Sequence, residues 1–574
     1  MKSSVLSNLS GVGGYDFVVA VTQASINATM ITYLDSLTSP EIIVCYISQE
    51  SVGTPGYTAV EVEFTKLLEL TEGVDPFTVT VPSDNQENDP NFQKLLKANF
   101  IMGFKARIGI PNVPDKSKLK DIVSLQGDTA QVGFNLMCSE FTVAGIETVS
   151  VDRFFIQSSQ TPASTWLFST QVDLRLGDLS DSGYSRLSPE AQRKIKNLSD
   201  SVFSIQQLLI DLSTATLAES VKISGVEAGS TVETFLEKYF IQKYIAKLKD
   251  TGEPMLGCAA VSKGTDRSTM LLTDMDFSVS PYVDSLGKPA ASDSQKELNT
   301  LNYLCATDHR ALGPAIRFPW NWVDESERAD HDGCISINRT RMIEWLEGLV
   351  KTTASYHCLR PTVFAKHHDG NITRLYVEVF FNENQQPVVE YPDKNMVDSQ
   401  GQKWNADGKT VLKFSWEGFA ADDDQAGNIE LRNKYAMTVD LVGSTIVITQ
   451  NIWVWYYVRV PAYGKGHIIV NDTLVDEYSL STENGALVVG TVKSKLTQAA
   501  DPHDRSANIS DVNDFGNKII EAVKQPTSIS LTSIPLSVAP SYVFPGGKSF
   551  LFKNVQFSEN QDLVACIAYA DPVQ

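Results

Sequence analysis

Apolar residues recur at spacings of three and four in several stretches of the chain, as in helices with one buried face. Residues 188–212 carry such a stripe after Ser-Pro-Glu, a strong helix start, and they predict a long helix. Residues 230–248 open with a capping-box pattern and predict a second helix. Residues 511–523 predict a third. We expect these apolar faces to contact a protein core rather than a cofactor.

Alternating apolar and polar residues dominate the second half of the chain and predict strands. Residues 412–417 alternate as expected for a strand with one solvated face. Residues 445–460 form an unusually long run with two apolar faces, so both faces should be covered or one should line a cavity. Because strands and helices do not alternate regularly, the pattern favours an α+β fold with antiparallel sheets over a doubly wound parallel sheet.

One helical pattern occurs twice. Residues 25–37 read SINATMITYLDSL and residues 336–349 read SINRTRMIEWLEGL, which run in step when one residue is deleted. Ser, Thr and Asn near each start should cap the helix. Two amphipathic helices could be this similar by chance; the alternative is a duplicated module whose core begins with the same helix. The residues expected on the buried faces are Ile26, Met30, Leu34 and Leu37 in the first copy and Met342, Trp345, Leu346 and Leu349 in the second.

Composition narrows the choice of partners. The chain has 574 residues, enough for two or three domains. Its formal net charge of −21 argues against nucleic-acid binding and against general attraction to an anionic membrane. We find no transmembrane segment and no secretory signal pattern at the N-terminus. The seven scattered cysteines are expected to be reduced, so we expect a cytoplasmic protein.

A stretch rich in Pro, Ser and acidic residues predicts a connector between two modules. We expect an N-terminal module over residues 1–285, a connector over 286–330 and a strand-rich C-terminal module over 331–574. Trp320 and Trp322 should pin the connector to a domain rather than bind a ligand.

Three short motifs resemble known sites but lack parts of them. The sequence PGGKS at 545–549 resembles a phosphate-binding loop, but the required upstream glycine is missing, which favours a hairpin turn. The sequence HHDG at 367–370 offers two imidazoles, but adjacent strand residues point to opposite faces, which argues against zinc. Residues 422–424 are three aspartates without the spacing of a calcium loop. We therefore expect no catalytic residues, no metal and no cofactor.

A lead-in segment before the first repeated helix carries a family resemblance. It reads GYDFVVAVTQA over residues 14–24, and the residues concerned are Tyr15, Asp16, Val18, Ala20, Ile26 and Asn27. It resembles the tubular lipid-binding (TULIP) superfamily and, more narrowly, the accessory proteins encoded beside some clostridial neurotoxin genes. The close resemblance covers about twenty residues, and neither the connector nor the chain after residue 330 is mapped onto the family. It implies long amphipathic helices wrapped by highly curved antiparallel sheets, as two related TULIP-like modules in an elongated molecule.

The resemblance implies a non-enzymatic lipid-binding or lipid-scaffold protein, an accessory component of a toxin or of another secreted complex. Acyl chains bind by burial at about 0.8 kcal/mol per methylene, and headgroups need few donors, so neither leaves a sharp motif. The expected ligand is a lipid or another apolar small molecule. If the groove is closed by the protein's own side chains, a structural protein with a protein partner is expected instead. A carbohydrate-active enzyme or lectin on the C-terminal half, with Trp404 and Trp416 as sugar platforms, is the further alternative.

Overall fold

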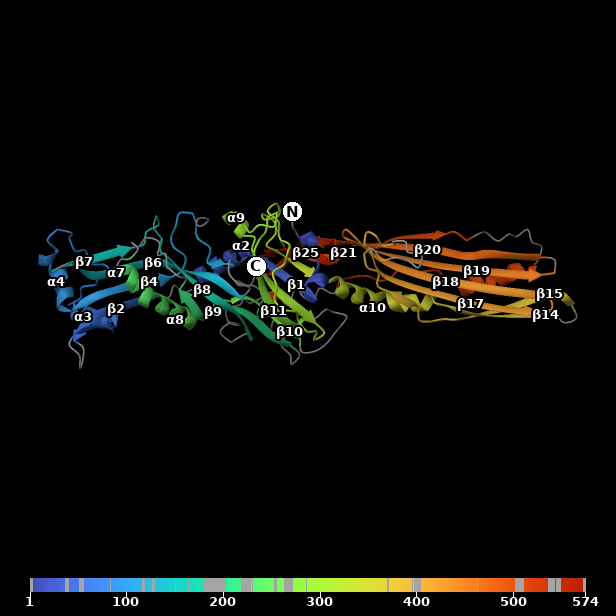
Figure 1. Ribbon diagram of the computed structural model, residues 1–574, viewed down its shortest axis with the longest axis horizontal. Helices are drawn as coiled ribbons and strands as arrows, with labels where there is room; N and C mark the ends of the chain where they lie inside the picture. Colours follow the sequence, from blue (N-terminus) through green and yellow to red (C-terminus); the bar gives the residue numbers. More distant parts are fainter. Residues whose placement is uncertain are drawn as a thin grey trace.

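The computed structural model shows an elongated molecule in which two arms extend in opposite directions from a central sheet (Figure 1). Antiparallel strands make up most of the secondary structure of the described residues. The structure describes residues 4–36, 41–50, 56–82, 84–115, 119–125, 130–149, 151–163, 165–178, 192, 203–217, 229, 231–251, 255–262, 272–284, 286–368, 371–394, 396, 404–461, 463–500, 510–534, 542–543 and 549–570.

Six antiparallel strands form the central sheet, in the order β11-β12-β1-β13-β25-β24. They are β1 (Phe17–Thr22), β11 (Leu272–Ser280), β12 (Thr300–Thr307), β13 (Gly333–Ile337), β24 (Ser549–Phe557) and β25 (Leu563–Ala570). Every residue of β1 is buried, as expected for a continuous apolar strand covered on both faces. Strand β1 pairs with both β12 and β13, so segments from both ends of the chain meet in one sheet.

The N-terminal arm, residues 23–262, is built on a sheet in the order β23-β10-β9-β8-β6-β4-β2-β3, with β5 and β7 paired to β6. Its strands are β2 (Glu41–Glu50), β3 (Tyr57–Val62), β4 (Phe100–Ile108), β5 (Val123–Ser124), β6 (Gln131–Val149), β7 (Asp152–Ser159), β8 (Leu167–Asp178), β9 (Phe203–Leu217) and β10 (Met255–Ser262), joined by β23 (Tyr542–Val543). The short helices of the arm and its borders are η1 (Ser4–Leu6), α1 (Leu9–Val12), α3 (Phe64–Leu70), η2 (Gln86–Asn88), α4 (Pro90–Lys97) and α9 (Asp293–Lys296).

One long helical segment lies along the sheet of the N-terminal arm. It consists of α7 (Thr231–Phe235), a π-helical turn η4 (Leu236–Phe240) and α8 (Ile241–Thr251), which confirms the helix predicted over 230–248. The ring of Phe240 lies 4.7 Å from that of Phe141 and 4.5 Å from that of Phe168, measured between centroids. Contacts between aromatic rings therefore pack this helix against β6 and β8.

The helix predicted over 188–212 is wrong in its second part. Residues 203–217 form strand β9, paired with β8 and β10, while the first part of the predicted helix lies outside the described residues except for Gln192. A short apolar run such as Leu208–Ile210 fits a buried strand as well as a helix. Pairing with two neighbouring strands, which no local pattern encodes, decided the outcome.

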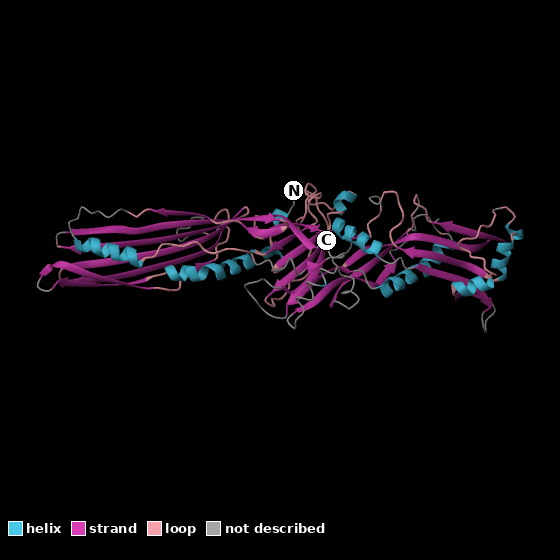
Figure 2. Cartoon of the chain, turned by 180° about the vertical axis from the view of Figure 1, so that it is seen from behind, coloured by secondary structure: helices cyan, strands magenta, loops and turns pink. Residues whose placement is uncertain are grey.

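The C-terminal arm, residues 338–534, is built on a sheet in the order β16-β17-β18-β19-β20-β21, with β22 paired to β20. Its strands are β16 (Val388–Glu390), β17 (Thr410–Asp424), β18 (Gly427–Val442), β19 (Thr445–Val460), β20 (Tyr463–Glu483), β21 (Ala486–Val489) and β22 (Lys493–Gln498), beside the hairpin of β14 (Arg360–His368) and β15 (Asn371–Asn382). Helix α10 (Arg339–His357) contacts β17 and β18, and α11 (Ser510–Ala522) contacts β15 and β20. Figure 2 shows both helices running beside the long strands.

The strands predicted over 412–417 and 445–460 are confirmed, as is the helix over 511–523. Along β19 the inner residues, from Ile446 to Val458, are buried at every second position, and the outer residues are half-buried apart from Arg459. One apolar face thus packs on the core while the other meets solvent in part.

The expected α+β class is confirmed, with mostly antiparallel strands, few helices and a sheet curled into a half-barrel. The arrangement as two related TULIP-like modules, and the division at residues 285 and 330, stay predictions. In the central sheet, β12 from the expected connector pairs with β1, which precedes the connector in the chain. Strand β1 in turn pairs with β13, which follows the connector. Trp320 and Trp322 are buried against this sheet, which confirms that they pin the connector.

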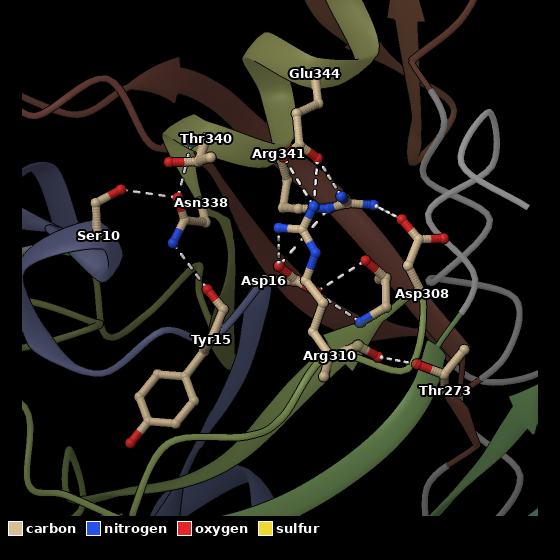
Figure 3. A network of polar contacts seen from close by, with 12 residues as sticks. Ser10, Tyr15, Asp16, Thr273, Asp308, Arg310, Asn338, Thr340, Arg341 and Glu344 are labelled. Carbon is tan, nitrogen blue, oxygen red and sulfur yellow. Dashed lines mark hydrogen bonds and ion pairs between the residues drawn. The ribbon is translucent and has the colours of Figure 1, made fainter. Parts of the chain in front are cut away.

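A buried ion network joins the central sheet to α10 (Figure 3). Asp16 directly precedes β1, and its carboxylate accepts hydrogen bonds from the backbone N–H (2.7 Å) and the hydroxyl (2.9 Å) of Thr307. Arg341 lies in the first turn of α10 with its side chain 3% exposed, and its Nε is 3.7 Å from the same carboxylate. Its Nη2 donates to Asp308 at 2.8 Å. Glu344, one turn further along α10, pairs with Arg341 as well.

The cap of α10 completes this junction. Asn338 Oδ1 accepts hydrogen bonds from the Thr340 backbone and from Ser10 Oγ, both at 2.8 Å. Its Nδ2 donates to the Tyr15 carbonyl at 2.9 Å, and its backbone N–H donates to the Asp16 carbonyl at 2.9 Å. The Tyr-Asp pair that carries the family resemblance therefore holds the start of α10 against β1.

Replacing Arg341 with methionine should destabilise the protein strongly. The substitution removes the guanidinium that pairs with Asp308 and Asp16 and leaves Arg310 to pair with Asp16, so the expected loss is about 3–5 kcal/mol, as when one partner of a buried pair is removed. Urea unfolding followed by tryptophan fluorescence measures the loss. Arg310→Met is the matched control, because the Arg310 side chain is 38% exposed and pairs with the same acids, so its effect should stay below about 1 kcal/mol. Equal losses in the two variants would contradict the role assigned to Arg341.

The last residue of α10 makes stability depend on pH. His357 is buried, its ring lies 5.6 Å from the Tyr435 ring, and its Nε2 has no hydrogen-bond partner among the described residues. Burial, with a further contribution from Lys524, lowers the pKa of His357 from its ordinary 6.5 to about 4. The folded state thus disfavours the imidazolium that the unfolded chain forms below pH 6.5.

Stability should therefore be complete above pH 6.5 and fall as the pH drops towards 4, by on the order of 3 kcal/mol. His357→Phe keeps a ring of similar size and removes the titration. Since acidic residues titrate in both proteins, the quantity to measure is the difference between their unfolding free energies across this range. A constant difference would contradict the assignment.

Candidate functional site

The two repeated helices begin in different registers. Helix α2 (Gln23–Ser36) starts after Thr22, whose Oγ1 accepts a hydrogen bond from the Ser25 backbone at 3.3 Å, whereas Asn338 caps α10. Met30 is thus the eighth residue of α2 and Met342 the fourth of α10. The alignment on Ser-Ile-Asn is wrong by one helical turn, because Asn27 lies inside its helix.

The predicted groove residues lie in one continuous apolar core. Both helices directly follow neighbouring strands, β1 and β13, of the central sheet. Leu37 lies outside the described residues, and Leu349 is partly buried against the core. The remaining six are at most 8% exposed: Ile26, Met30, Leu34, Met342, Trp345 and Leu346. Protein side chains surround them closely, and their role as lipid-groove residues stays a prediction.

A cavity of about 440 Å³ opens on the N-terminal arm. Its walls come from the segment after β4, from the segment before β8 and from β6. Most of the lining is apolar, with Lys120, Asp115 and Thr165 as the polar members. The apolar members are Pro111, Val113, Pro114, Leu119, Met137, Pro162, Trp166 and Leu167.

Helix α2 holds one wall of this cavity through buried polar side chains. Asn27 donates to the Val123 carbonyl and accepts from the Val123 N–H, both at 2.8 Å. Gln23 donates to the Asp121 carboxylate at 2.7 Å and accepts from the Leu125 N–H at 2.6 Å. The segment that carries Leu119 and Lys120 is thereby anchored at its far end to the first of the repeated helices.

Among the described residues, the charged members of the cavity lining are Asp115 and Lys120, and Asp121 follows Lys120 in the chain. Burial raises the pKa of the Asp121 carboxyl, although the hydrogen bond from Gln23 opposes the effect. Lys120 is exposed and belongs to the lining of the cavity, next to Leu119 in the chain. The arrangement can bury an apolar tail and pair one negative headgroup.

The floor of the cavity is continuous with the aromatic core. Trp166 is 2% exposed, and its ring lies 4.8 Å from that of Phe141, which in turn contacts Phe240. Met137 is buried, and its carbonyl accepts the Tyr244 hydroxyl at 2.9 Å. The floor is therefore rigid, while the walls are loops, a common arrangement for binding sites.

Sequence reasoning missed this site. The eight predicted residues are not among those that line it. The sequence contains a weak signal for the site. It consists of three prolines in two loops, each beside apolar residues and close to the end of a strand. Nothing local indicates that residues 111–120 and 162–167 face each other, because β6, which lies between them in sequence, pairs with β4 on one side and with β8 on the other.

An aromatic row lies on the outer face of the C-terminal arm. Phe419 is 55% exposed, and the guanidinium carbon of Arg432 lies 5.2 Å from its ring and 5.6 Å from the ring of Trp455. The rings of Trp455 and Tyr457 are nearly parallel, 16° apart, at 6.3 Å. Gly466 gives Trp455 room, since a Cβ there would lie 2.8 Å from the indole. Flat rings and a cation thus share one surface.

The other sequence candidates have structural roles. Trp416 donates its indole N–H to the Leu359 carbonyl at 3.0 Å and packs on the core, so it is not an open sugar platform. Trp404 is half-buried, with the Lys413 ammonium 5.1 Å from its ring. His367 pairs with Asp424 at 2.9 Å, on the neighbouring strand. In PGGKS only Ser549 is described, and it begins β24.

No protein-family model and no curated protein sequence matches this chain. Among solved structures, P47 of Clostridium botulinum E1 is similar over 97% of this chain and 100% of its own, with 9% identity and a TM-score of 0.40. A lipopolysaccharide binding protein is similar over 97% of this chain and 99% of its own, with 9% identity and a TM-score of 0.27. Within the described residues, no helix is both long and apolar enough to span a bilayer. The similar structures thus include a clostridial protein and a lipopolysaccharide-binding protein, and membership of the TULIP superfamily stays a prediction.

Proposed function

We propose that this protein binds a lipid or another apolar small molecule without transforming it. The observation that carries the proposal is the cavity of about 440 Å³ beside Trp166, with its mostly apolar lining. Its volume lies within the range of ligand sites, and its few polar groups suit recognition of one end of an amphipathic ligand. A role as an accessory component of a toxin or of another secreted complex belongs to the same proposal.

The chemistry of the rim favours an anionic headgroup. Lys120 supplies a positive charge next to Leu119 and opposite Thr165, so an acyl carboxylate or phosphate at the mouth would leave its chain against Trp166. Each buried methylene contributes about 0.8 kcal/mol, so about ten of them supply the roughly 8 kcal/mol of micromolar binding without further polar contacts.

Filling the cavity should abolish this binding. The probe is a fluorescently labelled long-chain fatty acid titrated into the purified full chain. Leu119→Trp should weaken binding by at least about tenfold, because displacing two methylenes costs roughly 1.6 kcal/mol. The matched control is Leu70→Trp on α3, where the leucine is 39% exposed and far from the cavity in sequence and fold, and its affinity should be unchanged.

Lys120→Glu tests the headgroup separately. It should weaken binding of the fatty acid but leave binding of an uncharged monoacylglycerol within about twofold. Extraction of the purified protein with organic solvent should also release a stoichiometric apolar compound. An empty extract, together with no uptake of either probe, would contradict the proposal and favour the closed, structural alternative.

The aromatic row of the C-terminal arm supports a second candidate, glycan binding. Large exposed aromatic side chains mark interaction surfaces, and flat rings offer apolar faces to sugar rings. Trp455 and Tyr457 form the flattest pair. On a glycan array, Trp455→Ala should lose the signal of the wild-type protein, while Trp404→Ala should retain it. Identical signals for the wild type and Trp455→Ala would exclude this surface.

A further inference from the structure

Two cysteines, a histidine and a glutamate converge on the face of the central sheet that the connector covers. Cys334 on β13 and Cys566 on β25 are directly opposed in the strand register, and their Sγ atoms lie 3.2 Å apart. Their exposed fractions are 0% and 1%. Ligand atoms of Glu327, His331 and Cys566 all lie within 4.8 Å of one another. The four side chains form a compact set of sulfur, nitrogen and oxygen donors.

The connector positions the two donors that do not come from strands. The His331 backbone N–H donates to the Glu327 carbonyl at 3.0 Å, so a helical turn brings these side chains to the same side. The Asp324 backbone donates to Glu327 Oε2 at 3.0 Å and orients the carboxylate. His331 Nδ1 is buried and has no hydrogen-bond partner in the described part of the chain. A buried polar atom left this way costs about 1–3 kcal/mol, so the fold alone does not account for it.

We propose that Glu327, His331, Cys334 and Cys566 bind one divalent transition-metal ion of the Zn²⁺ type. Thiolate and imidazole donors select such ions over Mg²⁺ and Ca²⁺. With bonds of about 2.0–2.3 Å, the ligand atoms of a tetrahedral zinc site lie roughly 3.3–3.8 Å apart. The two sulfurs are already near this spacing, and the ligand atoms of Glu327, His331 and Cys566, which lie within 4.8 Å of one another, would have to move closer by up to roughly 1.5 Å.

Such a site would be structural. Four protein ligands leave no open coordination position for a substrate. Metal binding would release the protons of both thiols and would join the connector to β13 and to β25, a strand 232 residues further along the chain. Trp320 and Trp322 pack the same connector onto the same sheet face, so the ion would reinforce a contact that apolar burial already makes.

A disulfide between Cys334 and Cys566 is the competing chemistry. The six cysteines whose side chains the structure describes are buried, and they form no disulfide with one another. A disulfide would use neither His331 nor Glu327, whereas a metal ion uses all four groups. This difference makes the two alternatives separable by substitutions in the connector alone.

The test is metal analysis of the full chain, purified under reducing conditions, loaded with ZnCl₂ and dialysed. The wild-type protein should retain about one Zn²⁺ per chain, and Co²⁺ in its place should give the sulfur-to-metal charge-transfer absorption of a thiolate site. His331→Ala and Cys566→Ser should each weaken Zn²⁺ binding by at least about a hundredfold, since loss of a supporting group alone costs 10–100-fold. Chelation should lower the Tm of the wild-type protein but not that of His331→Ala.

Cys305→Ser is the matched control, because Cys305 lies in β12 of the same sheet and packs into the core on the opposite face. It should retain the metal. If Cys566→Ser fails to fold, His331→Ala and Glu327→Gln still decide the question, since both residues are only half-buried. Substoichiometric zinc in the wild type, equal retention in His331→Ala, or a Cys334–Cys566 disulfide in protein alkylated during lysis would each overturn the proposal.

Discussion

The contact between Asp16 and Arg341 is the constraint on which the architecture depends. Both side chains are almost excluded from water, at 6% and 3% exposure, so each charge depends on nearby counter-charges: Asp16 also pairs with Arg310, and Arg341 also pairs with Asp308 and Glu344. Asp16 stands at the start of the strand that leads into the N-terminal arm, and Arg341 stands in the first turn of the helix that leads into the C-terminal arm. One buried pair therefore links the origins of both arms, and Asn338 adds a hydrogen-bonded cap at the same place.

The elongated shape follows from how β1 and β13 pair. The two strands are antiparallel neighbours, so the helices that continue them leave the central sheet at opposite ends. Each helix then needs its own sheet to bury its apolar side, because a helix alone cannot exclude water from that side. Both sheets grow outwards from one centre, and a continuous apolar core connects them. Much of the cavity lining, and the Glu327 and His331 side chains, come from loops beside these sheets.

The predicted groove residues and the cavity lie in different places, since none of the predicted residues in the described part of the chain lines the cavity. Met30 and Met342 are fully buried in the apolar core. The cavity lies against Trp166, and the polar side chains of Gln23 and Asn27 join α2 to the segment that carries Leu119 and Lys120. The buried side-chain amides of Gln23 and Asn27 bond the backbone of Val123 and Leu125. They fix this wall of the cavity, because leaving buried backbone groups unpaired would cost free energy.

The sequence by itself determined the α+β class, the helices over 230–248 and 511–523, the strands of residues 412–417 and 445–460, and the pinning role of Trp320 and Trp322. These features are local: a period, a cap or a large apolar side chain suffices to specify them. Only the tertiary structure decided that residues 203–217 pair as a strand, that the repeated helices differ in register by one turn, and where the cavity lies. Strand pairing, cavities and side-chain clusters join residues as far apart as Cys334 and Cys566, and no periodicity in the chain encodes which distant segments meet.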